Sequence, residues 1–162
     1  MTATRSVFGL AALGVLLAGA AAVWVLRSPG EGRVPSAASD TLVVYRSEGC
    51  DCCGAWAEYM RTAGFRVQVE RREEPVRLKR KLGVPPSLFS CHTAVLGGVI
   101  VEGHVPASTL RRFLSADAPA AGLSVPGMQA GSPGMASARP ASFSVFSFDG
   151  KGRPEVFERW RP

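Results

Sequence analysis

The sequence predicts an α/β domain preceded by an N-terminal apolar helix. Two observations support this prediction. Residues 7–26 form an unbroken apolar run, followed by a segment rich in Ser, Pro, Gly and Ala. From residue 41 onward, short β-branched runs alternate with stretches of helical periodicity. The part from 41 to 162 is long enough to bury one hydrophobic core without disulfide bonds.

The N-terminal run is interpreted as a membrane-targeting segment. A hydrocarbon core of ~30 Å needs about 20 apolar residues in a helix, and the apolar region of a cleaved secretory signal is shorter. Residues 1–27 are therefore predicted to be a signal anchor in the inner membrane, with a cleaved signal peptide as the alternative. Arg5 before the run favours a domain on the outer side, in the bacterial periplasm. Residues 28–40 are predicted to be a flexible linker.

The first half of the domain predicts two strands and two helices. Residues 41–46 are a β-rich apolar run, typical of a buried strand. Residues 54–63 carry apolar side chains at helical spacing and end before a glycine. Residues 65–70 alternate between apolar and polar, as in a half-buried strand. Residues 74–82 predict a second helix, and the following Pro85-Pro86 forbids helix there.

The second half predicts a hairpin and a third helix. Residues 93–96 and 99–101 flank two glycines, which is a hairpin signal. Residues 106–115 begin with a proline and place apolar side chains on one helical face. The predicted order is β-α-β-α-β-β-α, which is the thioredoxin arrangement. Its first two strands, joined through a helix, are expected to be parallel.

The C-terminal region predicts an extension of this unit. Residues 122–140 are rich in Gly, Pro, Ser and Met and predict a loop. Residues 143–148 and 156–160 flank an Asp-Gly-Lys-Gly segment and predict a terminal β-hairpin that could extend the sheet.

Four cysteines are the main candidates for chemistry: Cys50, Cys52, Cys53 and Cys91. The first three lie between a strand and a helix, where peptide N–H groups stabilise thiolate. Soft thiolates select Cu(I), zinc or iron–sulfur clusters. Cys91 precedes the third strand, which the thioredoxin topology brings against the cluster, so four thiolates could converge. The spacing is interpreted as neither the C-x-x-C of thioredoxins nor the paired C-x-x-C of zinc ribbons, which counts against disulfide exchange. A purely structural disulfide remains the alternative.

Two histidines and two methionines are further candidate metal ligands. His92 adjoins Cys91, but consecutive strand residues point to opposite faces, so both need not ligate. His104 either ligates or hydrogen-bonds the loop before its helix. Met128 and Met135 share a Pro-Gly-Met setting, which suits a thioether copper site, although loop methionines are usually only exposed or packed.

The formal net charge of +6 could indicate nucleic acid, anionic lipid or solubility. Much of it lies in two basic runs, at 71–72 and 77–81, which alternate with apolar positions and adjoin glutamates. We interpret these runs as the solvated face of a helix. No aromatic residues are interleaved as a base-stacking platform would need, so no nucleic-acid partner is predicted.

Several motifs resemble one known family. They are Cys50-x-Cys52-Cys53 followed by Trp56, Gly64-Phe65, Ser90-Cys91-His92-Thr93, EGHVP at 102–106, GLSVPGM at 122–128 and GSPGM at 131–135. In this order they resemble the small bacterial metal-binding proteins of the copper-resistance CopG type, which are thioredoxin-like and distinct from the ribbon–helix–helix repressors of the same name. The resemblance implies periplasmic copper handling through the cysteines and, in one branch, interconversion of Cu(I) and Cu(II). Asp51 stands where the family often has Gly, and Gln129 where Pro is common.

The sequence therefore predicts a periplasmic copper-binding protein for copper resistance. Copper, as Cu(I), is the expected ion, with zinc as the alternative. Expected partners are copper-transporting or copper-oxidising proteins of the envelope, together with the inner membrane through residues 7–26. Two other functions remain open: an envelope thiol–disulfide oxidoreductase, and a non-catalytic zinc-binding or interaction module.

Overall fold

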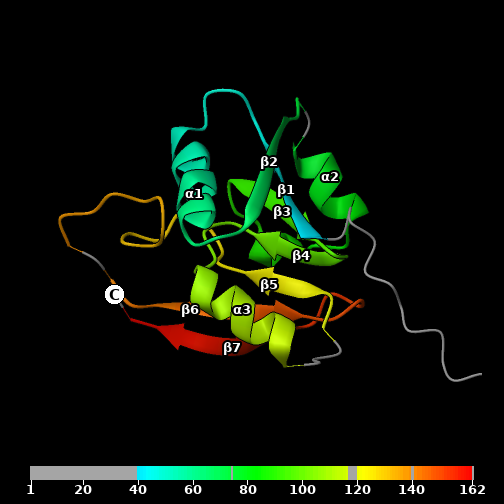
Figure 1. Cartoon of the computed structure of the whole chain (residues 1–162). Coiled ribbons are helices and arrows are strands. Elements are labelled where there is room, and N and C mark those ends of the chain that lie inside the picture. Colours follow the sequence, from blue (N-terminus) through cyan, green and yellow to red (C-terminus); the bar gives the residue numbers. More distant parts are fainter. Residues whose placement is uncertain (1–39, 74, 117–119, 140, 162) are drawn as a thin grey trace, which may run out of the picture. The chain divides into compact units, whose positions relative to one another are not determined.

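The computed structural model describes residues 40–161 apart from 74, 117–119 and 140 (Figure 1). These residues form a mixed α/β fold with a seven-stranded sheet and three α-helices, so the predicted α/β class is confirmed. The apolar segment at 7–26 and nearly all of the predicted linker at 28–40 lie outside the described residues. Within the described part, no helix combines the length and apolar character that a bilayer crossing requires.

The elements follow the predicted order and continue beyond it. They are β1 (Thr41–Arg46), α1 (Asp51–Thr62), β2 (Arg66–Arg71), α2 (Pro75–Lys81), the 3₁₀ turn η2 (Pro86–Leu88), β3 (His92–Leu96), β4 (Val99–Glu102), α3 (Ala107–Ser115), β5 (Gly122–Ser124), β6 (Phe143–Phe148) and β7 (Pro154–Trp160).

The sheet order is β2-β1-β3-β4-β5-β6-β7. Strands β1 and β2 are parallel, as a strand–helix–strand connection requires. Strand β3 is antiparallel to both β1 and β4, and the β3–β4 pair forms the predicted hairpin. The predicted terminal hairpin is also present, as β6 and β7, and it extends the sheet through β5.

Strand β5 lies inside the segment that the sequence predicts to be a loop. Its three residues, Gly-Leu-Ser, carry no β-branched side chain, so local propensity gives no strand signal. The strand exists because it pairs in parallel with β4 and antiparallel with β6. Tertiary pairing, which sequence periodicity does not report, therefore overrides the loop prediction.

Helices cover both faces of the sheet. On one face, α1 and α3 contribute Trp56, Met60, Leu110 and Phe113 to a core shared with side chains from β1, β3 and β4. On the other face, the segment after α2 contributes Val84 and Leu88, which pack with Ile100 and Phe148. Figure 1 shows α1 and α2 on opposite sides of β1 and β3.

Helix α1 begins earlier than the sequence predicts. The prediction placed its start at residue 54, but it starts at Asp51, with Cys50 as the N-cap residue. An acidic residue in the first turn interacts favourably with the helix dipole, which supports this earlier start. Cys52 and Cys53 consequently lie in the first turn of the helix. The proline pair before β3 excludes α-helix as predicted, although η2 begins at Pro86.

Candidate metal centre

Three of the four cysteines lie at the start of α1, with Cys50 at the N-cap and Cys52 and Cys53 in the first turn. Cys50 makes no side-chain cap hydrogen bond, so the helix keeps its N-terminal N–H groups and positive dipole end beside the sulfur atoms. The Arg46 guanidinium donates from Nη1 to the Cys50 carbonyl oxygen at 2.6 Å and fastens the turn to the end of β1.

The structure brings all four cysteines together. The sulfur atoms of Cys50, Cys52, Cys53 and Cys91 all lie within 4.8 Å of one another. Cys91 reaches the cluster because β3, which follows it, pairs directly with β1, which precedes the cluster. The arrangement suits one or more soft metal ions bound by thiolates.

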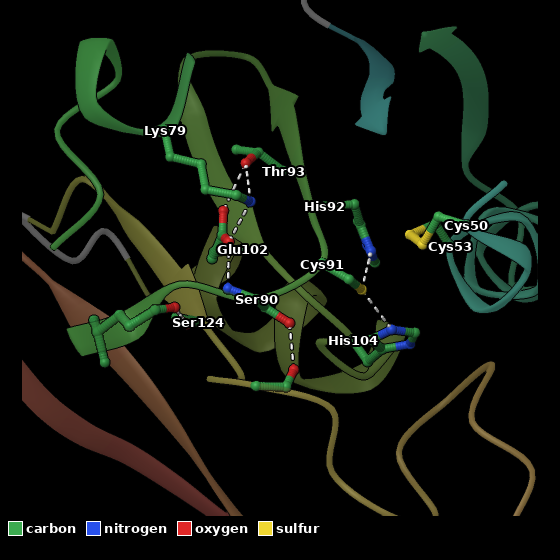
Figure 2. A network of polar contacts seen from close by, with 12 residues as sticks. Cys50, Cys53, Lys79, Ser90, Cys91, His92, Thr93, Glu102, His104 and Ser124 are labelled. Atoms are coloured by element: carbon green, nitrogen blue, oxygen red, sulfur yellow. Dashed lines mark hydrogen bonds and ion pairs between the residues drawn. A yellow bond between two sulfur atoms is a disulfide. The ribbon is translucent and has the colours of Figure 1, made fainter. Parts of the chain in front are cut away.

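Two of these four cysteines form a disulfide. Cys50 is bonded to Cys53 (Figure 2), while Cys52 and Cys91 keep free thiols. Cys50 and Cys53 are three residues apart, which is the C-x-x-C spacing, so the interpretation that the cluster lacks this spacing is wrong. Within the cluster the outer pair, Cys50 and Cys53, has this spacing, and the intervening Cys52 obscures it in the sequence.

Two buried histidines extend the site from Cys91. Its Sγ lies 3.3 Å from Nδ1 of His92 and 3.0 Å from Nε2 of His104 (Figure 2). The expectation that Cys91 and His92 point to opposite faces is wrong, because β3 begins at His92 and Cys91 lies in the preceding bend. Cys91, His92 and His104 form a second group of donor atoms within 4.8 Å of one another.

Hydrogen bonding fixes which imidazole nitrogens can accept a metal. Nδ1 of His104 lies 2.7 Å from the carbonyl oxygen of Pro133. A carbonyl only accepts, so Nδ1 carries the hydrogen and the Nε2 lone pair faces Cys91. His104 is thus bonded to the loop after β5, and not to the loop before its helix.

One ring nitrogen of His92 has no hydrogen-bond partner in the part of the chain that the structure describes. If the single thiol proton of Cys91 is donated to His104, Nδ1 of His92 must donate to the sulfur. Its Nε2 then holds a lone pair, and among the described residues this buried atom has no hydrogen-bond partner. Buried polar atoms are rarely left unpaired, so the His92 ring is a further candidate ligand.

Burial keeps the donors of this second group uncharged in the metal-free protein. Burial, reinforced by the neighbouring Cys52, raises the pKa of Cys91 to about 11. Burial lowers the pKa of His92 well below its usual range, and His104 and Lys79 lower it further. The pKa of His104 is also lowered by burial, against the opposing bond to Pro133. At neutral pH the imidazoles are therefore uncharged, and a metal that bound to the Cys91 sulfur would have to displace its proton.

The two candidate methionines lie in a loop that is fastened beside this group. Gly127 donates its N–H to the Phe89 carbonyl at 3.0 Å, and the Ser90 hydroxyl donates to the Gly127 carbonyl at 2.5 Å. Met128 is exposed and Met135 is half-buried. Thioether ligation by Met128 and Met135 stays a prediction.

One basic residue contradicts the prediction that the basic runs form a solvated helix face. Lys79 in α2 is buried and pairs with the buried Glu102 of β4 at 2.5 Å. The prediction fails for Lys79 because the carboxylate that neutralises its charge lies far along the chain. A glutamate directly after the predicted apolar strand at 99–101 was the available signal for this pair.

The chain is similar to two solved structures and to one protein family. Two solved structures named copper resistance protein CopG, form 1 and form 2, have TM-scores of 0.70 and 0.71 to the chain. Each is 36% identical, and each match covers 75% of this chain and 98% of the other. A family described as "Protein of unknown function, DUF411" matches residues 88–135, the segment with Cys91, both histidines and the methionine loop. No curated protein sequence gives a significant match.

Proposed function

The chain belongs to the family of the copper resistance protein CopG, and on this premise we propose that it binds copper ions in copper resistance. The observation that carries the proposal is the convergence of four cysteine sulfur atoms within 4.8 Å. Thiolates are soft ligands that prefer Cu(I) among the common biological oxidation states of copper. We therefore propose Cu(I) as the ion held by this cluster.

Copper binding by all four sulfur atoms requires the Cys50–Cys53 disulfide to be opened. The reduction takes up two electrons and two protons, breaks the S–S bond and yields two thiols. A dithiol reductant of the cell envelope would become a disulfide in exchange. Cu(I) then displaces thiol protons, so loading releases protons and depends on both pH and reductant.

The histidine pair supports a second part of the proposal, interconversion of Cu(I) and Cu(II). Imidazole suits Cu(II), while thiolate favours Cu(I). Cys91 belongs to both donor groups, since its sulfur lies near three other sulfur atoms and two imidazole nitrogens. A shared ligand of this kind would allow copper to stay bound while it passes one electron to an envelope redox partner.

We also propose a thioredoxin-like unit in the periplasm. The order β2-β1-β3-β4, with β3 antiparallel to its neighbours, supports that description of the first four strands. The apolar run at 7–26 supports attachment to the inner membrane. Copper-transporting or copper-oxidising envelope proteins are the proposed partners, and zinc is the competing ion.

The test is an anaerobic Cu(I) titration of the reduced full chain against a chromophoric Cu(I) chelator. The parent should compete for Cu(I), and Cys91→Ser should lower its affinity sharply because it removes the sulfur shared by both donor groups. Ser87→Ala, at an exposed position before Phe89, is the matched control and should bind as the parent does. Equal affinity of Cys91→Ser and the parent would exclude the four-sulfur site, and preference for zinc would exclude copper as the cargo.

The Cys50–Cys53 disulfide favours a second candidate function, thiol–disulfide exchange. Its C-x-x-C spacing at a helix N-terminus is the setting of reactive dithiols. Copper binding and thiol–disulfide exchange can be distinguished with the same preparation of reduced protein. A reduced protein that does not bind Cu(I) but reduces a disulfide substrate is an oxidoreductase.

A further inference from the structure

A buried polar network lies on the sheet face opposite the cysteine cluster. Lys79 Nζ donates to Glu102 Oε1 at 2.5 Å and to Thr93 Oγ1 at 2.9 Å. The Thr93 hydroxyl in turn donates to Glu102 Oε2 at 2.6 Å. Lys79 and Glu102 are almost completely inaccessible to solvent. Buried ion pairs add little net stability because both charges must be desolvated, so general stabilisation does not account well for this one.

The same carboxylate also contacts the backbone of the metal centre. Glu102 Oε1 accepts the backbone N–H of Ser90 at 2.7 Å, and Ser90 directly precedes Cys91 (Figure 2). Glu102 is itself two residues before His104, and the intervening Gly103 donates its N–H to the His92 carbonyl at 2.9 Å. One side chain therefore connects the segments that carry Cys91, His92 and His104.

We propose that the side-chain oxygen of Glu102 is a positioning group for the copper site, and that Lys79 neutralises the charge this oxygen carries. The Ser90 N–H bond fixes the bend that aims Cys91 at the two histidines. Without an acceptor there, the bend would gain freedom and the three donor atoms would no longer be held together. Groups that orient metal ligands in this way typically change metal affinity by 10- to 100-fold when they are lost. The inference rests on the proposed copper function.

The experiment must separate positioning from the stability of the ion pair. Replacing Lys79 or Glu102 alone would leave the other charge buried without a partner, which is strongly destabilising. Two double variants avoid this problem. Lys79→Met with Glu102→Gln removes both charges but keeps a carbonyl oxygen for Ser90, whereas Lys79→Met with Glu102→Leu removes both charges and the acceptor.

Cu(I) affinity of the reduced full chain is measured for both variants by chelator competition, with thermal unfolding as the check of folding. The Glu102→Gln double variant should bind about as tightly as the parent, and the Glu102→Leu double variant about 10- to 100-fold more weakly. A merely structural pair would leave the two variants with equal affinities. That result, at similar thermal stability, overturns the proposal.

Amide hydrogen exchange in the metal-free protein keeps this outcome distinct from the copper proposal. The Ser90 amide should stay protected in the Glu102→Gln double variant and should exchange faster in the Glu102→Leu double variant. If the parent binds no copper, the proposed function fails while the exchange data still decide whether Glu102 holds the bend. Equal Ser90 protection in both variants overturns the positioning role.

Discussion

At the scale of single residues, Cys91 is the centre of the candidate site. It is the one cysteine outside the segment at 50–53, and its sulfur lies near both the other three sulfur atoms and the two histidines. Its thiol is protonated at neutral pH because burial raises its pKa to about 11. The histidines beside it are neutral because burial lowers their pKa values. The metal-free site therefore carries less charge than its composition suggests.

The buried histidines predict a pH dependence of stability in the metal-free protein. The folded-state pKa values of His92 and His104 lie below the ordinary value of about 6.5. Below that pH the unfolded chain binds more protons than the folded one, so the free energy of unfolding falls as pH decreases. Urea unfolding between pH 7.5 and 5.5 should show a loss of at most about 1.4 kcal/mol per pH unit for each histidine.

His92→Gln is the matched comparison for this effect. It removes one titrating group, so the slope of stability against pH should become shallower than in the parent. Glu102, whose pKa burial raises, contributes with the opposite sign but equally in both proteins. Identical slopes in parent and variant would contradict the assignment of a neutral buried His92.

The residue types of the site could be predicted from the sequence, but the orientations and contact partners of several of these residues could not. Cysteines clustered before a helix indicate a metal or redox site because thiolates are both soft metal ligands and nucleophiles. The relative orientation of Cys91 and His92 depends on where β3 begins, a boundary that periodicity locates only to within a few residues. The partner of Lys79 depends on a contact across 23 residues, which no local pattern encodes.

At the scale of elements, the loop at 126–135 holds the His104 ring in place. Pro133 accepts the Nδ1–H of His104, and the adjacent Gly134 lies against the backbone of Trp56 in α1. A Cβ at Gly134 would approach the Trp56 nitrogen to 2.6 Å. The loop can reach His104 only because this position lacks a side chain.

Gly134→Ala should therefore weaken both the fold and the site. Gly127→Ala is the control, since both glycines have positive φ but Gly127 has open space around it. Gly127→Ala should cost about 1–2 kcal/mol from backbone conformation. Gly134→Ala should cost about 1–3 kcal/mol more, because the clash with α1 is an overpacking defect. Urea unfolding measures both, and equal losses would show that the contact with Trp56 is unimportant.

Element boundaries divide into those that local sequence sets and those that pairing sets. Strand β1 agrees with its predicted bounds because a short run rich in residues that favour strands defines it. Strand β5 has no such run and is defined by its neighbours. The start of α1 at Asp51 moves Cys52 and Cys53 from a turn into a helix. This change places their sulfur atoms at the positive end of the helix dipole.

At the scale of the whole described domain, sheet order creates the site. Strand β3 lies between β1 and β4, so the chain after β1, before β3 and after β4 meets at one edge of the sheet. These three segments carry Cys50 to Cys53, Cys91 with His92, and His104. The order of the elements made the convergence of these three segments predictable. The Cys50–Cys53 disulfide and the buried Lys79–Glu102 pair could be seen only in the three-dimensional structure.

We propose that copper is bound by the clustered cysteine sulfur atoms, with histidine nitrogen at the edge of the site. X-ray absorption at the copper edge of the reduced, Cu(I)-loaded full chain tests it most directly. We expect a first coordination shell dominated by sulfur, with an imidazole contribution that decreases in His104→Gln and a sulfur contribution that decreases in Cys91→Ser. A shell of nitrogen and oxygen alone, unchanged by Cys91→Ser, would contradict the claim.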